Sequence, residues 1–165
     1  MMVFDGDVTS IGDNAFDSRA TLISVTIPNS VLSIGEFAFQ NCTSLLSITI
    51  PNSVTGIRKR AFNNCSSLTS VTIGNSVASI GNDAFCVCSS LTSVTIGEGI
   101  TNIERDVFYG CSSLKTITCK ATTPPTLDSG NNLSNVTAVY VPAESVEAYR
   151  AATNWVYYSN IIQPI

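Results

Sequence analysis

The sequence contains no histidine and few charged residues. Among its 165 residues only 12% are charged, and the formal net charge is −4. Without histidine there is no Ser-His or Cys-His pair and no imidazole base, which removes the commonest nucleophilic and acid–base centres. The chain also has no glycine-rich phosphate loop and no recognisable pair of catalytic carboxylates. We therefore expect a protein that is not an enzyme and binds no cofactor.

Two further absences narrow the class of partner. The chain lacks an extended basic patch, which nucleic-acid binding requires in order to contact phosphates, so we expect no nucleic-acid partner. No apolar run approaches the roughly 18 residues of a membrane-spanning helix. The first seven residues also lack the basic start and apolar core of a signal peptide.

What the sequence does contain is a repeat of 23 residues. The segment LTSVTIGNSVASIGNDAFCVCSS begins at Leu68, and near-copies of it begin at Leu22, Leu45 and Leu91. A fixed period of this length predicts a solenoid, in which each turn buries its apolar residues against the next. We number the repeat positions from the leading leucine, which is position 1.

The pattern within one repeat predicts a strand, a turn and an inward return. Alternation of apolar and polar residues from Leu68 to Ile73 indicates a strand with one buried face. A turn follows, and Val77, Ile80 and Phe85 then point back into the core. Stacked strands of this kind form a parallel sheet with a spacing of roughly 4.8 Å. Five repeat strands and a remnant at Met2–Phe4 would span about 25 Å.

These patterns divide the chain into two parts. Residues 1–119 are expected to form the solenoid, with a partial first repeat at 1–21, full repeats from 22, 45, 68 and 91, and a degenerate repeat from 114. Residues 120–165 are expected to form a cap over the last turn, with a strand at 138–141 and a helix at about 143–153. Because the chain opens inside a repeat, we interpret it as part of a longer protein.

The pattern L-x-x-V-x-I-P-x-x-V-x-x-I-x-x-x-A-F-x-x-C, carried by Leu45–Cys65 and its copies, resembles the BspA-like, treponemal-type subfamily of leucine-rich repeats. The resemblance implies a right-handed, curved, horseshoe-like solenoid of α/β type, with its parallel sheet on the concave face. It also implies a secreted or cell-surface protein with a role in adhesion or protein binding. The ending VYVPAESVEAYRAATNWVYYSNIIQPI is similar to that of Bacteroidales surface proteins of this family.

Six cysteines are present, but their placement does not suggest disulfides. Four of them share position 21, which predicts a ladder of buried thiols: Cys42, Cys65, Cys88 and Cys111. Cys119 replaces a core isoleucine. Cys86 aligns with Gln40, Asn63 and Tyr109, so we expect its thiol to be exposed. We expect no metal site, because no histidine or second ligand pair accompanies Cys86 and Cys88.

The outward face of the sheet is the main candidate binding surface. Positions 3 and 5 place hydroxyl groups on it in two rows, which we call the hydroxyl face: Ser24, Thr26, Ser47, Thr49, Ser70, Thr72, Ser93, Thr95, Thr116 and Thr118. Position 2 grades from Ile23 and Leu46 through two threonines to Lys115. We find no aromatic residue among these positions. Strand propensity alone would also favour threonine in such rows.

A second candidate surface is a variable turn at positions 14–16, which carries Arg58, Lys59 and Arg60 and could dock an acidic partner. The leading hypothesis is an adhesion or interaction module that binds a host matrix or surface protein. The alternatives are a structural spacer within a larger surface protein and an ice-binding surface. Serine at four of the five position-3 sites weakens the ice-binding hypothesis, because it lacks the threonine methyl group.

Overall fold

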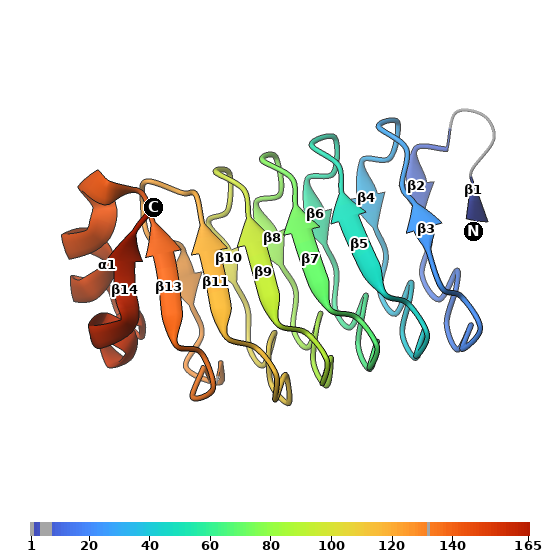
Figure 1. Ribbon diagram of the computed structural model, residues 1–165. Coiled ribbons are helices and arrows are strands. Elements are labelled where there is room, and N and C mark those ends of the chain that lie inside the picture. Colours follow the sequence, from blue (N-terminus) through green and yellow to red (C-terminus); the bar gives the residue numbers. More distant parts are fainter. Residues whose placement is uncertain (1, 4–7, 132) are drawn as a thin grey trace.

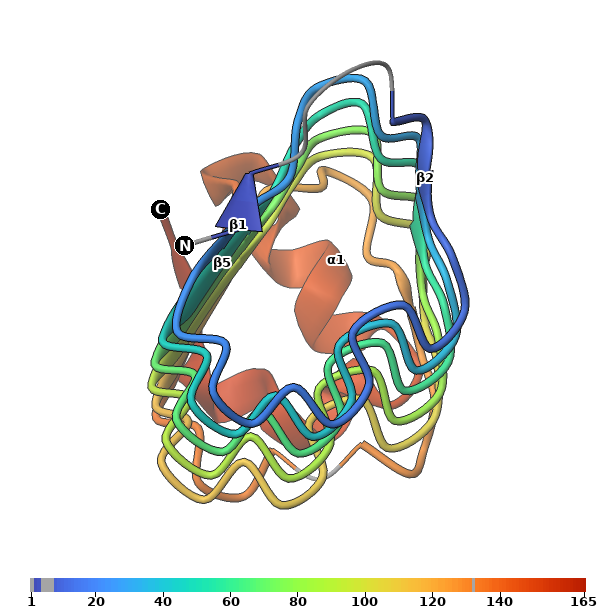
Figure 2. The same cartoon turned by 90° about the vertical axis from the view of Figure 1, so that its right-hand side faces the viewer.

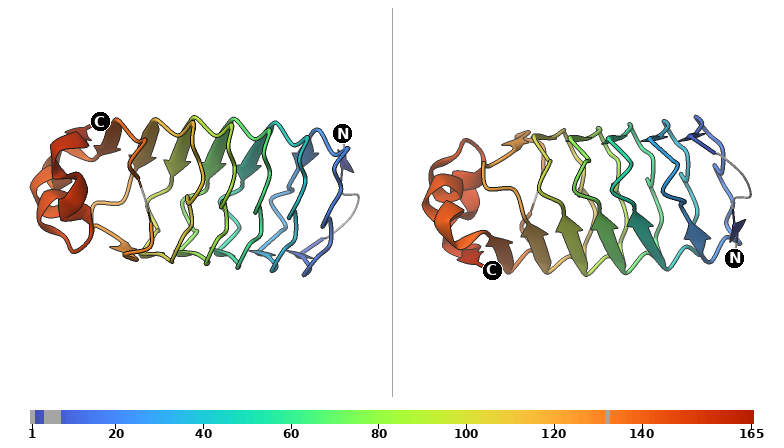
Figure 3. Two further views of the ribbon diagram at one scale, coloured as in Figure 1. Left: turned by 90° about the horizontal axis from the view of Figure 1, so that it is seen from below. Right: turned by 90° about the horizontal axis from the view of Figure 1, so that it is seen from above.

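The structure, a computed structural model, describes residues 2–3, 8–131 and 133–165. The chain forms a stack of turns that runs from the N-terminus to the C-terminus (Figure 1). Each turn passes from a strand in a main sheet to a shorter strand in a second sheet on the opposite side of the stack, and then returns (Figure 3). The fold is therefore the solenoid that the repeat predicts.

The main sheet is parallel and carries the leading strands. In the described residues its order is β14-β13-β11-β9-β7-β5. Equivalent positions pair directly, so Thr49 lies opposite Thr72 and Thr72 lies opposite Thr95. The strands are β5 (Ser47–Ile50), β7 (Ser70–Ile73), β9 (Ser93–Ile96), β11 (Thr116–Cys119), β13 (Ala138–Val141) and β14 (Ile162–Pro164).

The N-terminal end carries a small pair of strands. β1 (Met2–Val3) pairs in parallel with β3 (Val25–Thr26). The predicted remnant strand therefore exists at Met2–Val3, whereas Phe4 lies outside the described residues. The strand β3 belongs to the repeat that precedes β5, and the Leu46 amide donates a hydrogen bond to the Ile23 carbonyl at 3.1 Å.

The second sheet was not predicted. Over the described part of the chain its order is β12-β10-β8-β6-β4-β2. Each strand is only two residues long and ends in an inward isoleucine or leucine, as in Ile57 and Ile80. These strands are β2 (Ser10–Ile11), β4 (Ser33–Ile34), β6 (Gly56–Ile57), β8 (Ser79–Ile80), β10 (Asn102–Ile103) and β12 (Thr126–Leu127). The sequence predicted that the solenoid ends at residue 119, but β12 lies beyond that residue and still pairs with β10. The domain boundary at residue 119 therefore stays a prediction.

Turns, not helices, connect the second sheet back to the next leading leucine. Two positions in each turn are left-handed: position 16, as at Arg60 (φ 55°), and position 20, as at Asn64 (φ 57°). The turns are joined by backbone hydrogen bonds such as that from Phe62 N to Ala84 O, at 2.8 Å. Within the described residues, the helical character expected for a horseshoe-like fold is confined to the C-terminal cap.

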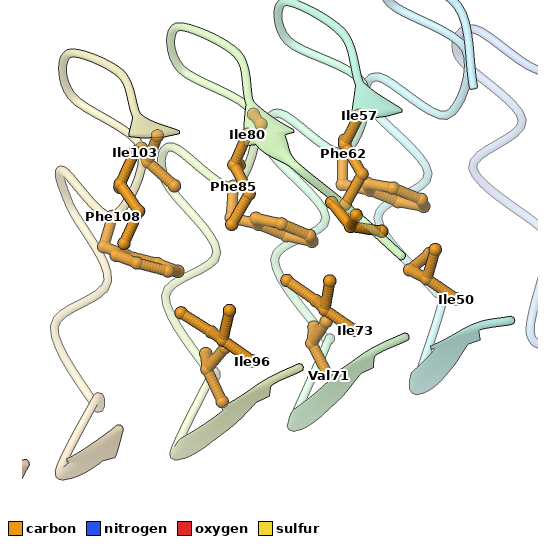
Figure 4. Packing of buried hydrophobic residues seen from close by; sticks show 14 of the residues in the cluster. Ile50, Ile57, Phe62, Val71, Ile73, Ile80, Phe85, Ile96, Ile103 and Phe108 are labelled. Carbon is orange, nitrogen blue, oxygen red and sulfur yellow. The ribbon is translucent and has the colours of Figure 1, made fainter. Parts of the chain in front are cut away.

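A column of phenylalanine rings runs through the core. Rings of Phe39, Phe62 and Phe85 lie nearly parallel, with centroids 5.1 and 5.2 Å apart, and all three side chains are fully buried. Isoleucines from the two sheets pack on either side of the column, as Ile73 and Ile80 do (Figure 4). No single turn could bury these residues, so the core depends on stacking.

The predicted thiol ladder is confirmed. Each position-21 thiol donates to the carbonyl of a phenylalanine in the preceding repeat: Cys65 Sγ lies 3.2 Å from Phe39 O, and Cys88 Sγ lies 3.2 Å from Phe62 O. The ladder thus supplies a donor to a buried backbone carbonyl in each turn, in the way that buried polar groups require. All six cysteines are free and buried.

The expectation that Cys86 is exposed was wrong, since its exposed fraction is 8%. The equivalent Gln40 and Asn63 are longer and only half-buried, so a side chain as short as cysteine does not reach solvent at this position. Burial, followed by the nearby Asp83 carboxylate, raises the pKa of Cys86 from 9.0 to about 11. The thiol is therefore protonated at neutral pH.

We expect all six thiols of the folded protein to react slowly with a thiol reagent at pH 8. With its pKa near 11, Cys86 would be only about 0.1% thiolate at that pH. The reaction rate of Cys86 should rise roughly tenfold per pH unit up to the pKa. Colorimetric thiol titration checks this, with urea-unfolded protein as the control in which every cysteine reacts. Rapid labelling of any thiol in the folded protein would contradict the burial of that cysteine, and rapid labelling at Cys86 would contradict its low exposure.

The cap closes the C-terminal end of the stack. It consists of β13, the 3-10 helix η1 (Ala143–Ser145), the helix α1 (Val146–Ala151), the 3-10 helix η2 (Trp155–Ile161) and β14. Looking along the stack, α1 lies across its far end (Figure 2). The strand predicted at 138–141 is confirmed. The predicted helix is shorter than expected, because the backbone is already extended at Ala152.

Two aromatic side chains anchor the cap. Trp155 is 1% exposed, and its Nε1–H donates to the Pro125 carbonyl at 2.8 Å. The Trp155 ring meets the Tyr149 ring edge-on, with centroids 5.3 Å apart. The Tyr149 hydroxyl donates to Ala121 O at 2.9 Å. The cap is thus tied to the last turn of the stack by both packing and hydrogen bonds.

Candidate binding surface

Strand alternation places the hydroxyl face on the outside of the main sheet. In β5 and β7 the residues at positions 3 and 5 are exposed while their neighbours are buried. Because the register is exact from repeat to repeat, Ser47 lies opposite Ser70, and Thr49 lies opposite Thr72. Exposure falls toward the C-terminus, where Thr95 and Thr118 are half-buried. The structure thus brings the predicted residues into two continuous rows.

The threonine row continues into the cap, which the sequence analysis missed. Thr118 pairs with Tyr140, and Tyr140 pairs with Gln163. The listed positions of the hydroxyl face hold no aromatic residue, but Tyr140 adds one where the row enters the cap. Tyr140 follows Thr118 by 22 residues, one short of the repeat period, so counting by repeats did not place it. The available signal was the alternation in the strand at 138–141.

A shallow hollow of about 720 Å³ lies on the hydroxyl face. The hydroxyl groups of Thr49 and Thr72 lie along it, and the turns after the strands contribute the amide side chains of Asn52 and Asn75. Lys120 is the one ionisable residue among the described residues that line the hollow. The hollow is therefore lined by groups that can form hydrogen bonds, and the ammonium of Lys120 gives its lining a positive charge.

The charged edge at Arg58, Lys59 and Arg60 lies by the second sheet, away from the hydroxyl face. All three side chains are exposed. Arg60 Nε forms an ion pair with Asp83 Oδ2 at 3.1 Å. Arg58 and Lys59 line a second hollow of about 500 Å³, together with Glu36 and Glu104. This edge therefore carries mixed charge and is not a uniform basic patch.

Among the residues that the structure describes, no group of three or more His, Cys, Asp or Glu side chains is placed to hold a metal ion. None of the helices in the same residues is long and apolar enough to cross a membrane.

A stack of turns with leading leucines, a continuous parallel sheet and a C-terminal cap defines a leucine-rich repeat protein. The family model for the BspA type leucine rich repeat region matches residues 9–126 in six copies, so the chain belongs to that family. The resemblance drawn from the sequence is confirmed. Among curated protein sequences, none matches this chain.

Two leucine-rich repeat proteins are among the solved structures that resemble the chain. A leucine-rich repeat protein of T. pallidum is 27% identical with a TM-score of 0.71, over 93% of this chain and 76% of that protein. A leucine-rich repeat protein of Bacteroides ovatus is 34% identical with a TM-score of 0.66. That match covers 82% of this chain but only 36% of the Bacteroides protein. The chain thus corresponds to about a third of this second relative.

Proposed function

We propose that the chain is a non-enzymatic adhesion module of a cell-surface or secreted protein, and that it binds a partner protein through the hydroxyl face. The observation that carries the proposal is the hollow of about 720 Å³ over two unbroken rows of hydroxyl groups. A rigid parallel sheet presents these groups at a regular spacing, which gives an extended surface for recognition.

The family supports this proposal. BspA-type repeats are modules often found in surface proteins, and leucine-rich repeats in general bind other proteins. A host matrix or surface protein is the partner class that fits such a module. An extracellular or cell-surface location follows from the same argument.

A structural spacer is the second candidate. It is favoured by the uniformity of the stack, in which most repeats differ little along the two sheets. A spacer would need no contact at the hydroxyl face, so the two candidates differ in whether substitutions there change binding. The ice-binding alternative predicts thermal hysteresis in cold solution, which neither of the other two predicts.

The proposal is tested by binding to a panel of immobilised host matrix proteins and mucins. We expect saturable binding by the wild type, and loss of at least tenfold in affinity in the triple variant Thr49→Gln, Thr72→Gln, Thr95→Gln. Three adjacent glutamines would fill the hollow with longer side chains and add no charge, so the variant tests the shape of the face alone. Circular dichroism establishes that the variant is folded.

The matched control places the same side chain on the opposite sheet. The triple variant Ser33→Gln, Ser79→Gln, Asn102→Gln changes outward positions of the second sheet, one in each of three turns. This control should bind as the wild type does. Binding that survives the threonine substitutions and is lost in the control would move the site to the second sheet. Absence of binding by the folded wild type would favour the spacer.

A further inference from the structure

Position 2 of the repeat borders the hydroxyl face and is apolar at its N-terminal end. Ile23 and Leu46 are 57% and 50% exposed. They lie in adjacent turns, joined by the hydrogen bond from Leu46 N to Ile23 O. Leu46 has a described turn on either side of it, so its exposure does not arise from the end of the stack. Two large aliphatic side chains thus lie together in solvent.

The fold does not require these aliphatic residues. The next repeats have threonine at position 2, and its hydroxyl donates to the carbonyl of the preceding turn: Thr69 Oγ1 to Leu46 O at 3.0 Å, and Thr92 Oγ1 to Thr69 O at 2.9 Å. Ile23 and Leu46 have no hydroxyl and cannot make this bond. They expose apolar surface where a threonine would add a hydrogen bond, which points to a use in binding.

The C-terminal end of the same face is cationic. Lys115 occupies position 2, and its ammonium lies 3.4 Å from Asn135 O. Lys120 lines the hollow, and no ion pair engages its ammonium among the residues described. Lys115 precedes β11 and Lys120 follows it, so the two lysines lie at opposite ends of that strand. Tyr140 extends the threonine row that passes between them. The face therefore grades from apolar, through hydroxyl, to positive.

We propose that the hydroxyl face binds an extended acidic segment of the partner protein. An apolar side chain of that segment packs on Ile23 and Leu46, and its carboxylates lie at Lys115, while Lys120 adds positive charge from the other end of β11. This inference rests on the proposed function and names the chemistry of its partner. Three strand spacings separate Leu46 from Lys115, or about 14 Å. An extended peptide covers that distance in about four residues.

The combination of contacts selects a polypeptide. An apolar anchor and an anion at a fixed separation are features that side chains of a peptide supply together. A sugar chain or a nucleic acid offers no aliphatic side chain for Ile23 and Leu46. Because the whole chain has a net charge of −4, an acidic partner is repelled elsewhere and drawn to this end of the face.

The test uses synthetic ten-residue peptides and amide chemical shifts of the isotope-labelled protein. The first peptide carries Leu-Leu and, four residues later, Asp-Asp; a second carries the two pairs in reverse order, because the direction of binding is not fixed. A third has Lys-Lys in place of Asp-Asp. We expect one acidic peptide to shift amides of β3, β5, β7, β9 and β11, and the lysine peptide to leave them unchanged. The affinity should fall as salt is raised.

Two double variants divide the site, and at position 2 they use the threonine of the neighbouring repeats. Ile23→Thr with Leu46→Thr should weaken the acidic peptide about tenfold, because the apolar side chain of the peptide loses the aliphatic surface on which it packs. Lys115→Thr with Lys120→Gln should weaken it similarly and remove the salt dependence. Lys59→Gln, a lysine change at the charged edge, should have no effect.

Three results would overturn the inference: no amide shifts with either acidic peptide, shifts confined to the Arg58–Arg60 edge, or equal binding of the lysine peptide. The proposed function has a separate readout. A panel protein that loses affinity in the threonine-to-glutamine variant, yet keeps it in both double variants, would leave the hydroxyl face as the binding surface and exclude the acidic segment.

Discussion

Replacing Phe85 by alanine should lower the free energy of unfolding by about 3–5 kcal/mol. Phe85 is fully buried, and its ring stacks on Phe62 at 5.2 Å and on Phe108 at 6.2 Å. The substitution leaves a cavity in the middle of the column, and the rigid sheets on either side limit how far the site can collapse. Urea denaturation followed by circular dichroism measures the change.

Tyr109→Ala is the matched control for this experiment. It removes an aromatic ring from the adjacent repeat, but Tyr109 is 55% exposed, so the expected change is within about 0.5 kcal/mol. A loss of less than about 1 kcal/mol for Phe85→Ala would contradict the role of the ring column in the core.

Replacing Trp155 by alanine should cost a similar amount, about 3–5 kcal/mol. The substitution removes the largest buried side chain of the cap, together with its contact to Tyr149, and leaves Pro125 O without its indole donor. The last turn would then lose the cover over its open apolar end. Urea denaturation followed by circular dichroism measures the loss, and increased binding of a hydrophobic dye would report the uncovered turn.

Two controls separate packing from hydrogen bonding in the cap. Trp155→Phe keeps an aromatic ring but leaves the Pro125 carbonyl unpaired, so part of its cost, about 1–3 kcal/mol, reports the missing donor. Val156→Ala changes a neighbouring residue that is 48% exposed, and should have little effect. Equal stability of Trp155→Ala and the wild type would show that the cap does not hold the last turn.

The stack and the hydroxyl face could be predicted because the period forces register. Once each repeat begins with leucine and lasts 23 residues, Thr49 must lie beside Thr72, and Ile50 must lie beside Ile73. The same argument placed the cysteine ladder. It failed for Cys86, where exposure depends on how far neighbouring side chains reach rather than on the alignment of positions.

The second sheet and the left-handed turns could not be predicted in the same way. Strands of two residues, such as Gly56–Ile57, are too short to show an alternation. The left-handed position 20 holds Asn41, Asn64 and Gly110, which favour this conformation, but also Ser18 and Val87, so the residue preference is incomplete. A β-branched residue is unusual in this conformation, and the hydrogen bonds of the adjacent turns impose it.

For the candidate surface, the sequence predicted the rows but not the hollow above them. That Tyr140 and Gln163 extend the threonine row follows from where the cap strands pair. The repeat period ends before those strands, so only the three-dimensional structure could join these residues to the predicted face.

The hydrogen bonds that join turns mostly connect residues about one repeat apart, as Phe62 N and Ala84 O are. Loops of this length close readily, so folding can begin at any turn and spread to its neighbours.

The near-identity of the repeats also allows mispairing between two molecules. In two partly unfolded molecules, β5 of one chain can pair with β7 of the other chain as well as with β7 of its own chain. The two chains can therefore exchange turns in register. Trp155 and Tyr149 have no counterpart in the repeats, and the cap they anchor marks the correct end of the stack.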